Sequence, residues 1–212
     1  IGVLLMSVSG QWFGTILPET LTLGYYQSIF TNAITSTSIR NSLLYSVCST
    51  LLDVAFGLVV AWLLSRKRFP GRNLLDALIM LPLALPGIIL AFGYVATFSG
   101  TALDPRTNPT ILLVLSYGLR RMPYMVRSAY AGFQQTSVTL EEAAQSLGAS
   151  PARTLRKITI PLITANLIAG MLLCFAYAML EVSDSLILAM REEYYPITKA
   201  IYILSTSTSE GY

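Results

Sequence analysis

The chain has 212 residues, of which 54% are hydrophobic and 12% charged, and its net charge is +3. Soluble domains carry about 25% charged residues, so this composition argues for lipid as the solvent. Histidine is absent, and Cys48 and Cys174 lie inside apolar runs. Most zinc sites and any disulfide framework are thereby excluded, and we expect no metal or other cofactor.

Two segments precede the first complete predicted span. Residues 1–17 are apolar and are expected to form the outer part of a membrane helix, with a signal-like segment as the alternative. Residues 18–38 have apolar side chains at helical spacing, which fits either an amphipathic helix on the membrane surface or a loop. The chain begins inside an apolar run and ends in a polar stretch, so we expect truncation at both ends.

Residues 41–65 predict a membrane span with Asp53 near its middle, and Gly57 and Ala61 are spaced for close helix packing. The basic turn at residues 66–72 marks the cytoplasmic side by the positive-inside rule and is too short to indicate nucleic-acid binding. Residues 73–98 predict a second span. Pro82 and Pro86 should kink it, which fits either a helix lining a solute path or simple kinked packing.

A polar loop at residues 99–109 leads to a third predicted span at residues 110–132. Its arginines, Arg120, Arg121 and Arg127, are costly in hydrocarbon and must reach the inner surface, an acid or an aqueous cavity. Asp53 is a candidate partner for Arg120 and Arg121 by depth.

Residues 163–190 predict a fourth complete span. Glu181 and Asp184 lie toward its outer end, three residues apart and hence on one helix face. Acids at this depth indicate a substrate path or gate, unless they lie just outside the hydrocarbon and are merely solvated. With the first, incomplete span, the expected fold is an all-α integral membrane protein, a polytopic bundle of about five transmembrane helices.

The polar segment at residues 133–162 separates the third and fourth spans and is expected to face the cytoplasm. Thr139 can cap a helix start, with Glu142 at the capping-box spacing. Gly148 should end that helix, and Ser150 followed by Pro151 should start another. The pattern predicts a helix, a glycine elbow and a second helix.

This segment resembles the cytoplasmic signature of the permeases of binding-protein-dependent (type I) ABC importers. The match comprises Glu142, Ala143, Ala144, Gly148, Ile158 and Pro161, and Ile160 stands where the family usually has leucine. The resemblance implies that residues 1–212 form one permease domain and that the short helix is a coupling helix docked on an ATPase. We assign the coupling contacts to that same set together with Glu141 and Leu147.

The resemblance also implies the partners and the location. These are an ABC ATPase dimer, a second permease domain (a homodimer or a fused pseudo-dimer), a periplasmic solute-binding protein and membrane lipid, with no nucleic acid. The expected location is the bacterial inner membrane, as a multi-pass protein. We assign the translocation path or gate to Glu181, Asp184, Pro82, Pro86, Asp53, Arg120 and Arg121.

No catalytic motif occurs: a nucleophile elbow, a His-Glu-x-x-His pair and a phosphate-binding glycine loop are all missing. The chain is therefore expected to be a transport subunit and not an enzyme, with ATP hydrolysis on a partner. Residues 181–186 and 195–202 resemble permeases for ferric iron, and relatives of similar pattern serve thiamine, polyamines, phosphonates or sulfate. The alternative of another class is a secondary transporter or channel that needs no ATPase.

Overall fold

The computed structural model describes residues 2–10, 18 and 20–206, and the part it describes is helical with one isolated β-bridge between Ser9 and Leu21. The polar segment at residues 133–162 is called the coupling segment below, after the role that the resemblance implies. The helices that begin before it are α1 (Gly2–Val8), α2 (Gly24–Thr31), α3 (Ala33–Arg66), α4 (Arg72–Ala84), α5 (Gly87–Phe98) and α6 (Thr110–Gln135). Those after it are α10 (Thr164–Met179), α11 (Ser183–Leu188), the 3₁₀ turn η2 (Glu192–Tyr194) and α12 (Ile197–Thr206). The expected all-α class is confirmed.

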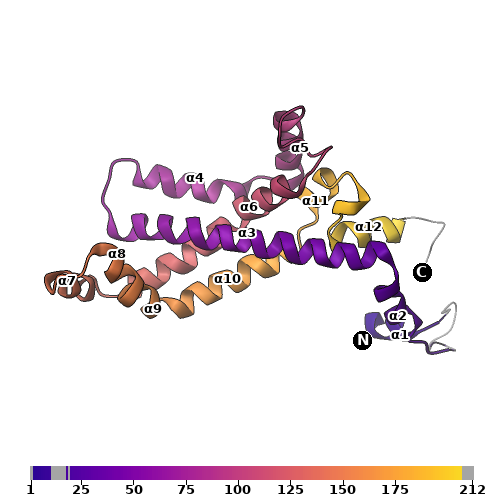
Figure 1. The fold of residues 1–212 in the computed structure, drawn as a ribbon, viewed down its shortest axis with the longest axis horizontal. Helices are drawn as coiled ribbons and strands as arrows, with labels where there is room; N and C mark the ends of the chain where they lie inside the picture. The colour runs from indigo at the N-terminus through magenta and orange to yellow at the C-terminus, as the bar shows by residue number, and fades with distance from the viewer. Residues whose placement is uncertain (1, 11–17, 19, 207–212) are drawn as a thin grey trace.

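The long helix α3 is the axis of the molecule, and α6 and α10 pack along it (Figure 1). Glycines permit this close approach, because a Cβ on Gly57 would lie 2.8 Å from Met125 Cγ and one on Gly170 would lie 2.8 Å from Met125 Sδ. The predicted packing role of Gly57 and Ala61 is confirmed, and Ala61 is fully buried. Large apolar side chains on the outer faces of α3, α4, α5 and α10 remain exposed, as expected for helices that contact lipid.

By length and composition α3 qualifies as a membrane span, and up to three spans result if each bent helix pair counts as one. In the first bent pair, α4 and α5 meet at 102°. The chain breaks at Leu85 and Pro86, as the prolines predicted, while Pro82 stays inside α4. The sequence predicted about five spans. Helix α6 has the length of a span, but its three arginines make it more polar than the others.

Three predicted boundaries differ from the structure. Helix α3 begins at Ala33, so the last part of the segment expected on the membrane surface, residues 33–38, belongs to it, while α2 occupies the middle of that segment. The predicted fourth span is interrupted between Met179 and Ser183, which separates α10 from α11. Residues 11–17 of the predicted first span lie outside the described residues, and α1 covers only seven residues before them.

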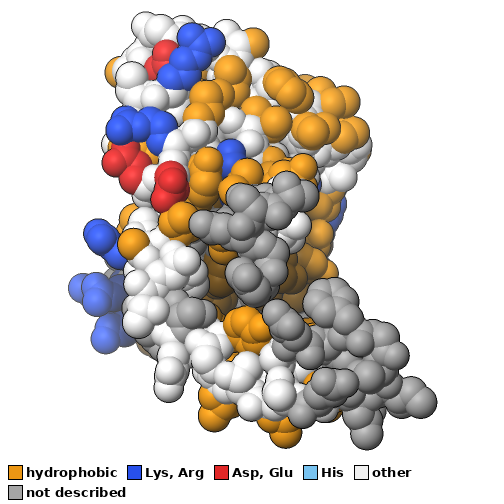
Figure 2. Space-filling view, turned by 90° about the vertical axis from the view of Figure 1, so that its right-hand side faces the viewer, with side chains coloured by type: hydrophobic (Ala, Val, Ile, Leu, Met, Phe, Trp, Pro, Cys, Tyr) orange, Lys and Arg blue, Asp and Glu red, His pale blue; other side chains and the backbone are white. Residues whose placement is uncertain are grey.

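The coupling segment lies at one end of the molecule, beside the turn between α3 and α4, and α1 and α12 lie at the other (Figure 1). It comprises α7 (Val138–Ser146), α8 (Pro151–Thr154), the π-helical turn η1 (Leu155–Thr159) and α9 (Ile160–Leu162). Figure 2 shows the opposite end, where charged side chains lie along one edge and apolar ones gather in the upper part, away from that edge.

Candidate functional site: an exposed docking helix and a buried charge cluster

Helix α7 starts and stops on local hydrogen bonds. Ser137, and not the predicted Thr139, is its N-cap, because the Thr139 N–H donates to Ser137 Oγ over 3.3 Å and the helix begins two residues earlier than expected. At its end Gly148 has a φ of +87°. The Gly148 N–H donates to Gln145 O and the Ala149 N–H to Ala144 O. This pair of bonds is the Schellman motif, so the predicted glycine stop is confirmed.

The second helix restarts as the sequence predicted. Ser150 is the N-cap of α8, its Oγ accepts from the Arg153 N–H over 3.4 Å, and Pro151 follows in the first turn. A π-helical turn then precedes Pro161, whose missing N–H leaves a gap in the helix ladder. Helices α8–α9 and α10 meet at 74° just beyond it. The elbow and this bend turn α7 across the end of the bundle.

The outward face of α7 is apolar and open. Leu147 is 90% exposed and Leu140 is about half exposed. A hollow of about 440 Å³ lies beside them, lined by Leu140, Ala143, Ala144, Leu147, Gly148, Ala149, Arg153 and Ile158. Most of the residues assigned to ATPase coupling thus share one hollow. Glu142 and Pro161 are exposed outside its lining.

Glu141 differs from the rest of that set because it points into the molecule. Its Oε1 lies 3.0 Å from Arg66 Nη2 and also accepts from Thr159 Oγ1 over 3.3 Å. The side chains of Arg66 and Glu141 are only 10% and 12% exposed. Sequence reasoning placed Arg66 in a basic turn and missed this contact, since the two residues are 75 positions apart.

A second group of assigned residues forms a buried charge cluster, defined as Arg120, Arg121, Glu181 and Asp184. Arg121 Nη2 donates to Glu181 Oε2 and to Tyr177 O, and Arg120 Nη1 lies 3.5 Å from Glu181 Oε1 and 3.5 Å from Asp184 Oδ1. Glu181 is 4% exposed and Asp184 is fully buried. The reading of these acids as merely solvated is therefore wrong. So is their placement on one helix face, because Glu181 lies in the break before α11.

The cluster lies where two broken helices meet. A Cβ on Gly87, the first residue of α5, would overlap Arg120 Nη1 and would lie 2.8 Å from Ser183 Cβ at the start of α11. Arg120 thus reaches from α6 into the contact between α5 and α11. Pro86 lies in the break between the end of α4 and the start of α5, whereas Pro82 lies one turn earlier, inside α4.

Asp53 does not join the cluster, so the pairing expected from depth is wrong. It is 1% exposed, and neither carboxyl oxygen has a hydrogen-bond partner among the described residues. It lines a mostly apolar pocket of about 250 Å³ with Phe56, Tyr94 and Phe98. The guanidinium groups that were expected to reach Asp53 are instead paired with the carboxylates of Glu181 and Asp184, which come from a different part of the chain.

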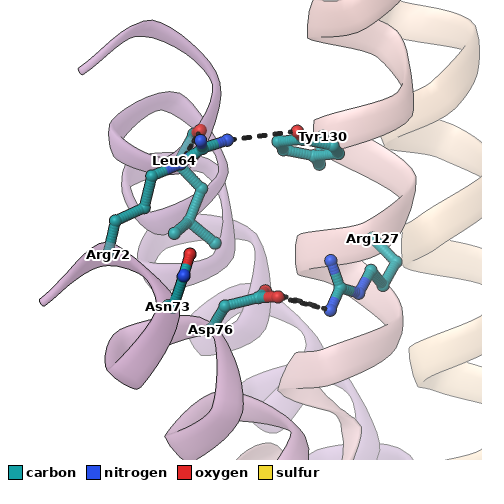
Figure 3. A pocket seen from close by; sticks show the side chains of 6 residues that line it. All are labelled: Leu64, Arg72, Asn73, Asp76, Arg127 and Tyr130. Atoms are coloured by element: carbon teal, nitrogen blue, oxygen red, sulfur yellow. Dashed lines mark hydrogen bonds and ion pairs between the residues drawn. The ribbon is translucent and has the colours of Figure 1, made fainter. Parts of the chain in front are cut away.

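Two further polar arrangements lie outside the helix bundle's interior. Near the turn between α3 and α4, a pocket of about 130 Å³ contains the Arg127–Asp76 pair at 2.9 Å, and Arg72 bonds to Leu64 O and Tyr130 Oη (Figure 3). In the loop after α5, the N–H groups of Gly100 and Arg106 donate to the Asp104 carboxylate. These bonds hold the pKa of Asp104 below its usual range.

Comparison with known proteins gives one family. The model of the family described as "Binding-protein-dependent transport system inner membrane component" matches residues 53–202. The chain is 32% identical to the molybdate/tungstate transport system permease protein WtpB of Pyrococcus furiosus, over all of this chain and 82% of that protein. It is 32% identical to the sulfate transport system permease protein CysT of Salmonella typhimurium, over 74% of this chain and 60% of that protein.

A third relative and one solved structure extend the comparison. The ferric transport system permease protein FbpB of Actinobacillus pleuropneumoniae is 32% identical over 77% of this chain but only 24% of its own length. The crystal structure of a bacterial ABC transporter involved in alginate import matches with a TM-score of 0.73 and 22% identity, over 98% of this chain and 72% of that one. At that identity the structural match supports the fold alone.

Proposed function

Because this chain belongs to the family of binding-protein-dependent transport system inner membrane components, the permease subunits of ABC importers, we propose that it forms the solute path of such an importer. An ATPase dimer docks on the outward face of α7, a second permease domain completes the path, and a periplasmic binding protein delivers the solute. The proposed location is the bacterial inner membrane, with several spans.

The observation that carries this proposal is the coupling segment itself. It lies at one end of the bundle with an open apolar hollow, and the basic turn at residues 66–72 lies at the same end (Figure 1). By the positive-inside rule that end faces the cytoplasm, where an ATPase is available. An ATP-independent transporter has no use for such a surface, so this feature favours the importer.

We assign the gate to the charge cluster. The two arginines and two carboxylates of the cluster sum to zero charge. They are largely shielded from water between α6 and the breaks that precede α5 and α11. Helix breaks at membrane depth are tolerated where the freed backbone is buried or faces a cavity. A rigid-body movement that separates the breaks before α5 and α11 would open these ion pairs. The gate would then have two discrete arrangements, one with the ion pairs closed and one with them open.

For the solute we propose a small oxyanion of the molybdate or sulfate class. The solutes named for the two relatives matched over most of their length support it. Glu181 and Asp184 give no support to a cation, because both are already paired with arginine. Ferric iron stays the second candidate on the strength of the ferric relative, matched over a smaller part of its length.

The test is purification of the full chain from its native membranes in mild detergent, with identification of the subunits that come with it. The complex and its binding protein are then placed in vesicles, and ATP-dependent uptake of radiolabelled molybdate, sulfate and ferric iron is compared. An ATPase subunit and oxyanion uptake are expected. Uptake without ATP would overturn the importer in favour of a secondary transporter, and uptake of iron alone would overturn the oxyanion assignment.

A further inference from the structure

At the end of the molecule that carries the coupling segment, the guanidinium of Arg66 contacts several helices. Arg66 is the last residue of α3, and its Nε and Nη2 both contact Glu141 Oε1, at 3.1 and 3.0 Å. Nη2 also donates to Thr136 O, just beyond α6, over 3.0 Å, and the guanidinium carbon lies 5.5 Å from the centre of the Phe133 ring. Arg66 therefore joins α3, the end of α6 and α7.

The carboxylate of Glu141 carries the connection one step further. Its Oε1 accepts from Thr159 Oγ1 in η1, and Thr159 is 1% exposed. This π-helical turn leads through the bend at Pro161 into α10. A single carboxylate on α7 thus contacts the segments that continue into α10 and the end of α3, and these two helices pack along each other in the bundle.

The geometry suits transmission of force more than docking. The outward face of α7 has Leu147 and the open hollow, whereas Glu141 faces inward and is nearly buried. Charge-assisted hydrogen bonds from a rigid guanidinium fork are directional, so they fix the position of α7 against α3 in a way that apolar contact alone does not. A displacement of α7 is then passed to α3 and α10 together.

Resting on the proposed function, we propose that Arg66 and Glu141 are positioning residues that transmit the movement of the docked helix α7 into α3 and α10. Neither residue touches solute in this role, and neither is needed to recruit the ATPase. The link predicts a specific defect, in which the complex assembles but solute no longer controls ATP hydrolysis.

The experiment compares the purified complex containing R66M, E141A or both with wild type. The ATPase subunit should still co-purify, and thermal unfolding should still be cooperative. The stimulation of ATP hydrolysis by solute-loaded binding protein should fall about five- to tenfold, the usual size of a coupling between sites. Because the two residues act as one unit, the double variant should be no worse than the more impaired single variant. R66K should be intermediate, since an ammonium keeps the charge but lacks the rigid guanidinium fork that holds Glu141 and Thr136 O together.

The matched control is the Arg127–Asp76 pair, an ion pair at the same end that joins α4 to α6 and is more exposed (Figure 3). R127M and D76N should leave the stimulation unchanged. Full stimulation in R66M, equal loss in the control pair, or loss of the ATPase subunit from R66M would each overturn the proposed link. Wild-type chain that recruits no ATPase would instead overturn the proposed function, so the two failures are distinguishable.

Discussion

Arg120 depends on a residue that has no side chain. Its guanidinium occupies the space where a Cβ of Gly87 would lie, and Ser183 closes the other side. The glycine therefore allows α5 and α11 to approach around a charge that is paired with Asp184.

G87A should destabilise the protein by about 1–3 kcal/mol, the usual cost of an overpacked site, because Arg120 must leave its carboxylates or α5 must move. Thermal unfolding in detergent measures the effect. G93A is the matched control on the same helix, since nothing lies within 4 Å of a Cβ there. That variant should be neutral or more stable by up to about 1 kcal/mol. Equal behaviour of the two variants would contradict this account.

The ion pairs of the charge cluster lead to a second prediction at this scale. E181Q leaves Arg121 buried without its carboxylate, and removing one partner of a buried pair costs about 3–5 kcal/mol. D53N removes a carboxylate of similar burial that has no hydrogen-bond partner among the described residues, so it should cost much less. The midpoints of thermal unfolding of the two variants decide the matter. A loss in D53N as large as that in E181Q would restore Asp53 as a partner of the arginines.

At the scale of elements, α7 is held at its end by a backbone conformation. A Cβ on Gly148 would meet nothing within 4 Å, so any penalty there comes from the φ of +87° and not from lack of space. The elbow can therefore be perturbed without disturbing the packing around it.

G148V should raise the energy of the elbow by about 1–2 kcal/mol, because a branched residue resists the left-handed region. Membrane insertion should be normal while solute uptake is uncoupled from ATP hydrolysis. G148N should retain most of the coupling, since asparagine tolerates this conformation. Membrane yield and solute-stimulated ATP hydrolysis are the measurements. Normal stimulation in G148V would refute the role of the elbow.

The loop between α5 and α6 has its own stabilising element in Asp104. Because its pKa is lowered in the folded state, its contribution to stability is present above the unfolded pKa of about 3.9 and is lost as the pH falls through the folded value. Unfolding temperatures of wild type and D104N, measured from neutral to acidic pH, should differ near neutrality and converge below about pH 4. A difference that persists in acid would contradict this.

At the scale of the whole molecule, the proposed docking surface, which is the outward face of α7 with Leu147, and the charge cluster lie apart along the bundle. Leu147 projects from the coupling end and supports no part of the core, because it is 90% exposed. In the proposed complex the ATPase subunit would cover this side chain.

L147E should therefore leave the unfolding midpoint of the isolated permease within about 0.5 kcal/mol of wild type, as expected for a surface change. It should remove the ATPase subunit from the purified complex, because a charge is then buried against an apolar surface. Co-purification measures this, with T139A on the same helix as the control for a general loss of helicity. Undiminished recovery of the ATPase with L147E would place the docking face elsewhere.

The sequence by itself determined the helical class, the apolar bundle and the helix–elbow–helix of the coupling segment. Each of these depends on neighbours within a few residues: a run of apolar side chains, a glycine that reaches positive φ, a serine followed by proline. The local signals failed at their edges, where α3 begins at Ala33, Ser137 caps α7 in place of Thr139 and Met179 ends α10 early.

Only the tertiary structure decided which charges pair. Depth along a span suggested Asp53 for Arg120 and Arg121, but the choice of partner depends on which helices are neighbours. The actual partner Glu181 is 60 positions from Arg121, and Glu141 is 75 from Arg66. No local pattern carries that information, because the break before α11 and the bend at Pro161 bring those carboxylates to the arginines only when the bundle packs.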